Sequence, residues 1–133
     1  MSDLLELGPE HIAAQLAATL AFANRGATGQ FKVYLDNDVL QIAVPLANPC
    51  GVIVGDALGL IAQEAGGALI LVSGIPRRAE WLNGEGKLVV RGTVSDGTHD
   101  GNFRIEGGLT PAGETGPTLY AGGLWSIRDL TFN

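Results

Sequence analysis

Hydrophobic residues recur along the chain at two different spacings, and the change of spacing separates a helical part from a β part. In the segment "PEHIAAQLAATLAFANRG" the apolar residues Ile12, Leu16 and Leu20 lie four positions apart, with alanines between them. The proline near its start suits a first helical turn, and the closing glycine suits a helix end. The pattern predicts one amphipathic helix over residues 9–25.

From residue 30 the spacing becomes two, as in a strand with one buried face. In "FKVYL" and "VLQIAV" alternate residues are apolar, and the "DND" between them is typical of a turn. These segments predict a hairpin. We expect it to be followed by a break at "PLANPCG", because Pro45 and Pro49 fit an edge or a loop better than a central strand.

The segment 51–73 is open to two interpretations. "GVIV", "LGLIAQ" and "ALILVS" are short apolar runs bounded by glycines, which favours strands. The run "DALGLIAQEAGG" also fits a helix capped by Asp56, although Gly59 in its interior would cost about 1 kcal/mol relative to alanine. We favour strands and keep the helix as the alternative, because it would change the expected function.

Alternation returns in the last third of the chain. "KLVVRGTV" and "NFRIEG" are typical of half-buried antiparallel strands. In "GLWSIRDLTF" the apolar positions change parity, so we expect one strand with a bulge near residues 128–129. The bulge would bring four apolar side chains onto one face: Trp125, Ile127, Leu130 and Phe132.

The order of these elements predicts the fold class. About eight short antiparallel strands after one helix indicate a mainly β protein with a β-sandwich or jelly-roll-like body. The 20 glycines suit many tight turns between short strands. We expect a single domain over residues 1–133, with the helix at about 9–25 and the β body at about 30–133.

The net charge of the chain limits the classes of partner that we expect. Fourteen acidic and eight basic residues give a net charge of −6, and no basic run is longer than Arg77-Arg78. Without a basic stripe, we expect neither nucleic acid nor a membrane as a partner. The one cysteine excludes an intrachain disulfide. The start of the sequence has no secretion-signal pattern, which favours synthesis in the cytoplasm.

The candidates for chemistry all have ordinary structural explanations. Asp96, His99 and Asp100 suggest a weak metal site, but a solvated turn explains them as well. Cys50 has no base nearby in the sequence and fits a buried structural thiol. The remaining candidates are pairs of carboxylates that would act as acid and base, and a helix start and a turn explain them: Glu6 with Glu10, and Asp36 with Asp38. We therefore expect no catalytic, cofactor-binding or metal site.

Several segments together resemble a group of small proteins encoded by tailed bacteriophages and prophages. They are the Ala-rich first helix, "FKVYL", "IAVPLANPCG", "GDALGLIAQ", "AEWLNGEGKLVVRGTVS", "NFRIEGGLTPAG" and "LWSIRDLTF". The sequence departs from that pattern at "GIPRR" and in its acidic balance. The resemblance implies a non-enzymatic structural component of the phage particle, associated with the tail or capsid. Its partners would be other copies of itself and other virion proteins, assembled in the host cytoplasm.

This expectation includes a mode of assembly. The narrow apolar stripe of the helix must be covered by its own β body or by a neighbour, and "GATGQ" at residues 26–30 looks like a flexible joint that allows either. We expect homo-oligomers that form through the helix at 9–25, either in solution or only on the native platform of the particle.

Two other classes of protein remain as alternatives. A helix at 55–66 would suggest a hot-dog-like acyl-thioester enzyme with Asp56 or Glu64 as acid or base. An exposed Trp81 or Trp125 would suggest a sugar-binding module, because sugars stack on accessible indole rings.

Overall fold

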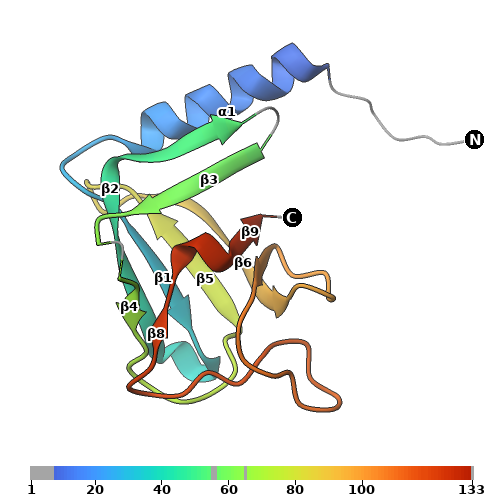
Figure 1. Cartoon of the computed structure of the whole chain (residues 1–133). Coiled ribbons are helices and arrows are strands. Elements are labelled where there is room, and N and C mark those ends of the chain that lie inside the picture. The colour runs from blue at the N-terminus through green and yellow to red at the C-terminus, as the bar shows by residue number, and fades with distance from the viewer. Residues whose placement is uncertain (1–7, 55–56, 65, 133) are drawn as a thin grey trace, which may run out of the picture.

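The computed structural model describes residues 8–54, 57–64 and 66–132 and shows a mainly β protein with one N-terminal helix (Figure 1). The helix α1 spans Pro9–Ala23, as its spacing predicted. The strands are β1 (Gln30–Tyr34), β2 (Leu40–Val54), β3 (Ala57–Ala62), β4 (Ala68–Leu69), β5 (Arg78–Leu82), β6 (Leu88–Asp96), β7 (Phe103–Ile105), β8 (Leu124–Trp125) and β9 (Leu130–Phe132). Two single turns of 3-10 helix complete the fold, η1 (Asp36–Asp38) and η2 (Ile127–Asp129).

Seven of the strands form one sheet in the order β3-β2-β1-β5-β6-β7-β9, which curves until it is nearly closed. A separate pair, β4 and β8, lies beside it. The expected sandwich of antiparallel strands is therefore replaced by a mixed sheet, because β7 runs parallel to β6. The tight loop after β6 is the cause. The loop brings the chain back beside Val94, so that Phe103 of β7 pairs with Val94 of β6. Within the loop, the hydroxyl of Ser95 accepts a hydrogen bond from the Gly101 amide at 2.9 Å.

The predicted break at "PLANPCG" is wrong, because β2 continues through both prolines. The first part of β2 pairs with β1 as far as Pro45, and the part from Gly51 onward pairs with β3. The register is irregular between Leu46 and Gly51, and Pro49 lies within this stretch. The strand bends there and changes partner, so the missing amide of Pro49 interrupts no regular ladder.

The strand interpretation of residues 57–62 is confirmed, and residues 55, 56 and 65 lie outside the described residues. On β3 the side chain of Leu60 is buried and that of Leu58 is half-buried, while Gly59 and Ile61 are exposed. This alternation is what a strand at the edge of a half-buried sheet requires.

The last segment is not one bulged strand, as the sequence predicted. Trp125 ends β8, which pairs with β4, and Leu130 starts β9, which pairs with β7. The turn η2 lies between them, and the Ser126 hydroxyl accepts a hydrogen bond from the Arg128 amide. Trp125 and Ile127 are buried and Leu130 is half-buried, so the expected burial holds for these three; the side chain of Phe132 lies outside the described part.

Aromatic side chains form the centre of the core. Phe31 packs edge-on against Phe103, with ring centroids 5.4 Å apart, and stacks on Trp125 at 6.2 Å. Aliphatic residues from most strands surround these rings: Val33, Ile42, Val44, Leu46, Leu60, Val94, Ile105 and Ile127.

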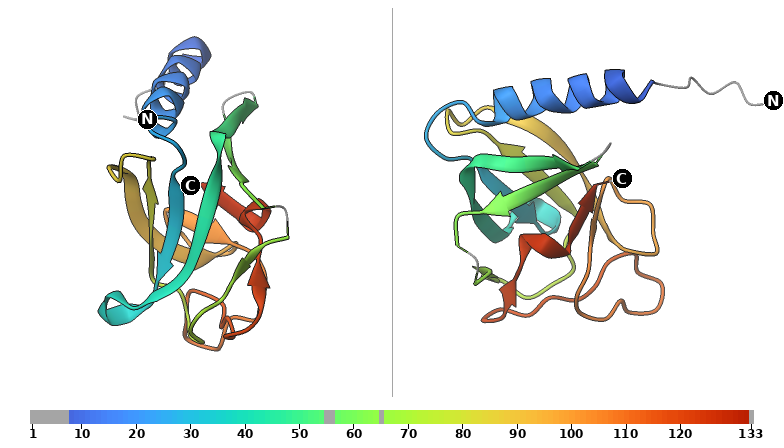
Figure 2. Two further views of the ribbon diagram at one scale, coloured as in Figure 1. Left: turned by 90° about the vertical axis from the view of Figure 1, so that its left-hand side faces the viewer. Right: turned by 45° about the horizontal axis from the view of Figure 1, so that its top comes forward.

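The helix α1 lies across one end of the curved sheet, between the β2–β3 and β5–β6 hairpins (Figure 2). Ala23 is its one buried residue among those described, and the apolar residues Ile12, Leu16 and Leu20 are half-buried. Leu20 contacts the core cluster and lies against Gly51 of β2. The helix is therefore covered on one side over its C-terminal turns.

The segment after α1 is tied to its surroundings by hydrogen bonds and close backbone contacts, which the expectation of a flexible joint at "GATGQ" did not include. The Nδ2 of Asn48 donates to the carbonyls of Asn24, Gly26 and Ala27, and Asn24 Oδ1 accepts from the Cys50 amide at 2.8 Å. Gly26 has φ +82° and approaches Gly84 so closely that a Cβ would clash with its backbone. The glycines here permit close backbone contact, and this contact fixes the direction in which α1 leaves the sheet.

Candidate functional site

The sequence candidates for a metal site do not converge. Asp96 Oδ1 lies 2.7 Å from His99 Nδ1, but the exposed Asp100 pairs with Arg104 instead. In the described part of the chain, no three His, Cys, Asp or Glu side chains gather around a common point.

Asp96 organises the loop after β6. It accepts hydrogen bonds from the Thr110 hydroxyl at 2.5 Å, from His99, and from both the amide and the hydroxyl of Thr98. These donors, that of Thr110 above all, hold the pKa of Asp96 far below its usual range. The turn explanation of this cluster is thus supported, and the carboxylate is fixed in its charged form.

Cys50 is buried, and burial raises the pKa of its thiol. A thiol that is kept neutral and covered is a poor nucleophile, which agrees with the structural role expected from the sequence.

The two carboxylates of the turn between the first strands are paired with arginines. Asp38 pairs with Arg78 at 2.6 Å, and Asp36 lies 3.7 Å from Arg77, so both tie η1 to the start of β5. Glu10 is exposed at the start of α1, and Glu6 lies outside the described residues.

The structure removes the observation on which each alternative function depended, for the acyl-thioester enzyme and for the sugar-binding module. Residues 57–62 form a strand, so the helix that the acyl-thioester enzyme requires is missing there; Asp56 lies outside the described residues, and Glu64 is exposed. Trp81 and Trp125 are only 1% and 3% exposed, so neither indole offers a face to a sugar.

An apolar surface that the sequence did not single out lies on the β4–β8 pair. Leu69 and Leu124 are directly opposite each other across the two strands. With Leu71 and Tyr120 they form what we call the β4–β8 patch, in which the four residues are 52%, 67%, 50% and 67% exposed, respectively. The neighbouring segments are joined by hydrogen bonds, including Ile70 N to Gly123 O at 2.8 Å. The patch lies at the opposite end of the molecule from α1 (Figure 1).

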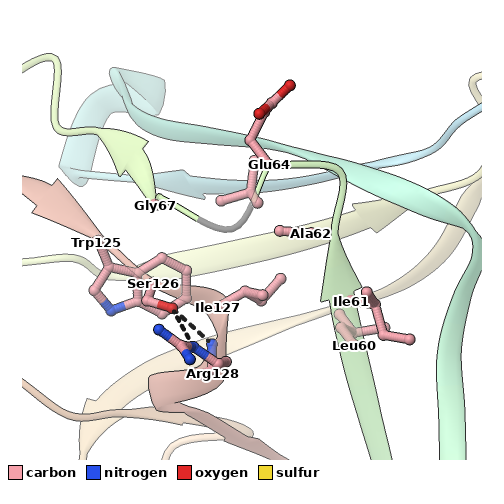
Figure 3. Close-up of a pocket in the computed structure, with 10 residues that line it drawn as sticks. Leu60, Ile61, Ala62, Glu64, Gly67, Trp125, Ser126, Ile127 and Arg128 are labelled. Atoms are coloured by element: carbon pink, nitrogen blue, oxygen red, sulfur yellow. Dashed lines mark hydrogen bonds between the residues drawn. The ribbon is translucent and has the colours of Figure 1, made fainter.

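A cavity of about 250 Å³ opens at the seam of the sheet, where β3 approaches η2 (Figure 3). We call it the seam cavity. Val44, Leu60 and Ala62 line one side, and Trp125 and Ile127 line the other. Its charged lining residues are Glu64 and Arg128. The sequence carried no signal for it, because the wall joins β2 and β3 to a segment about 60 residues later.

Comparison with known proteins gives no assignment: no protein-family model, curated protein or solved structure matches this chain significantly. Among the described residues, the structure contains no helix with the length and apolar character needed to cross a membrane.

Proposed function

We propose that this protein is a non-enzymatic structural subunit that works by self-assembly, as a component of a bacteriophage particle associated with its tail or capsid. The observation that carries the proposal is the β4–β8 patch. It holds four large apolar or aromatic side chains, each at least half exposed: Leu69 and Leu124 on the paired strands, and Leu71 and Tyr120 in the segments next to them. Contiguous apolar surface of this kind marks contacts between proteins.

The position of a second surface supports a head-to-tail contact. The half-buried stripe of α1 lies at the end of the molecule away from the β4–β8 patch (Figure 1). Two different surfaces at opposite ends favour a heterologous interface, which closes into a ring when the rotation between subunits allows it. Rings and lattices are what a particle component must build.

The fixed joint supports the same use. Asn83 Nδ2 donates to the Phe22 carbonyl at 3.2 Å, and the Gly84 amide donates to the Arg25 carbonyl at 2.9 Å. An arm held in one direction loses little conformational entropy when it meets a neighbour. The resemblance to tailed-phage proteins supplies the setting, in which the neighbours are other copies and other virion proteins.

Light scattering on purified variants tests the proposal. We expect the full chain to be a homo-oligomer and Leu124→Asp to shift it toward monomer, because a buried unpaired carboxylate is costly at an apolar interface. Leu88→Asp is the matched control, since Leu88 is also exposed but lies on β6. An oligomer that responds equally to both changes would place the interface elsewhere.

A further inference from the structure

The seam cavity has an apolar body. Its aliphatic and aromatic wall comes from β2, β3, β8 and η2, so the cavity lies beside β3, which is one edge strand of the seven-stranded sheet. A cavity of about 150 Å³ with such walls is enough to hold benzene. At about 250 Å³, this one has room for a ring or a short alkyl chain together with a small head group.

One buried donor on the wall lacks an acceptor. The indole Nε1 of Trp125 is buried and has no hydrogen-bond partner within the described part of the chain. Buried N–H groups are rarely left without a partner, because their desolvation is then uncompensated.

A second donor lies three residues later. Arg128 Nε donates to the Ser126 hydroxyl at 3.3 Å, and none of the ion pairs between described residues includes Arg128. Figure 3 shows the indole nitrogen on the lower edge of its ring, the edge turned toward the Arg128 guanidinium in this view. The Ser126 hydroxyl already accepts from Arg128, so it does not satisfy the indole.

Glu64 is the acid on the wall, and its carboxylate points away from Arg128 in Figure 3. On the side of Trp125 and Arg128, these two side chains therefore offer donors to the cavity, and the one acidic side chain of the wall lies away from them. A carboxylate fits this edge, because it accepts from both an N–H group and a guanidinium.

We propose that the seam cavity binds a small carboxylate with an apolar tail. The tail lies between Leu60, Ala62 and Ile127, and the carboxylate pairs with the exposed Arg128. It accepts a hydrogen bond from Trp125 Nε1 after a local shift of the wall, because this atom is closed to solvent in the structure. This site does not depend on the assembly proposed above. Phenylacetate and hexanoate have the required size and charge.

Calorimetric titration of phenylacetate into the full chain tests the site. We expect saturable binding with one molecule per chain, and little binding of the neutral 2-phenylethanol or of the cation phenethylamine. Arg128→Gln should weaken binding at least about tenfold, because a hydrogen bond to a charged group is lost. Arg25→Gln removes an exposed arginine at the end of α1 and should leave binding unchanged.

Two further variants separate the tail from the head group. Ala62→Phe should abolish binding by filling the cavity, whereas Trp125→Phe keeps a ring in place and should weaken binding severalfold by removing the N–H. Thermal melts of each variant without ligand show whether it is folded. The proposal is overturned if millimolar phenylacetate and hexanoate both fail to bind the folded wild-type chain. It is also overturned if Arg128→Gln binds as tightly as wild type, or if phenethylamine binds as tightly as phenylacetate.

Discussion

The rings of Phe31 and Trp125 are stacked, with their planes inclined by 24°. Phe31 lies on β1, in the middle of the seven-stranded sheet, and Trp125 lies on β8 of the two-stranded sheet. The stack therefore joins the two sheets inside the core, in addition to the hydrogen bond from the Leu71 amide to the Gln41 carbonyl at 2.8 Å.

Replacement of Trp125 by alanine should consequently be costly. We expect Trp125→Ala to lower the free energy of unfolding by about 3–5 kcal/mol, as is typical when a buried aromatic side chain is removed. Chemical denaturation measures this change. Leu124→Ala, at the exposed position next to it, should cost less than about 0.5 kcal/mol. A similar loss in both variants would mean that the stack does not join the sheets.

The close approach of Gly29 to β5 gives a second prediction. A Cβ at Gly29 would clash with the carbonyl oxygen of Leu82, whereas a Cβ at Gly59 would meet nothing within 4 Å. Gly29→Ala should therefore destabilise the protein by about 1–3 kcal/mol through overpacking. Gly59→Ala should be neutral or slightly stabilising, since alanine costs less backbone entropy. Equal effects in thermal melts would contradict the close contact.

Asn48 gives a third prediction, which concerns the attachment of α1. Its Nδ2 donates to the Ala27 carbonyl at 2.7 Å, and to those of Asn24 and Gly26 at 3.2 and 3.3 Å. We expect Asn48→Ala to cost about 0.5–1.5 kcal/mol, because exposed carbonyls after the helix exchange their donor for water. Hydrogen exchange of the α1 amides should become faster than in wild type. The control is Gln15→Ala, at an exposed position on α1, which should leave hydrogen exchange near the joint unchanged. If Asn48→Ala also leaves this exchange unchanged, the joint is held by other contacts.

The stability of the protein should depend on pH through Asp96. Its folded-state pKa is lowered by the hydrogen bonds from Thr110 and His99, so the charged carboxylate stabilises the fold above the pKa of an unfolded aspartate, about 3.9. That stabilisation is lost as the pH falls from about 5 toward the lower folded-state pKa. In thermal melts, lowering the pH from about 5 to about 3 should therefore reduce the melting temperature less for Asp96→Asn than for wild type.

Asp100 provides the comparison for this experiment. It is almost fully exposed and pairs with Arg104 at the surface, so Asp100→Asn should follow the wild-type pH profile. If Asp96→Asn loses stability with pH as steeply as wild type, the carboxylate of Asp96 does not carry this dependence.

The sequence predicts elements well where one face is buried along a continuous segment. The spacing of Ile12, Leu16 and Leu20 gives α1, and the alternation in "FKVYL" gives β1. It fails where tertiary contacts override a local rule. Pro45 and Pro49 indicate a break, yet β2 continues because its partner changes from β1 to β3 at that point.

The candidate sites show the same limit. The local cluster around Asp96 is visible in the sequence, because its turn residues are neighbours in the chain. The β4–β8 patch and the seam cavity are not visible, because each joins segments about 50 or more residues apart. Ala68 faces Trp125 and Leu69 faces Leu124 only after the sheet has curved.

The central claim is that this protein acts by self-assembly. The mass of the full chain in solution tests this claim most directly. Light scattering over a dilution series should give a mass well above the 13.8 kDa of one chain at high concentration. The mass should fall toward that value on dilution, because the β4–β8 patch and α1 are small contact surfaces. A mass of one chain at every concentration would contradict the account.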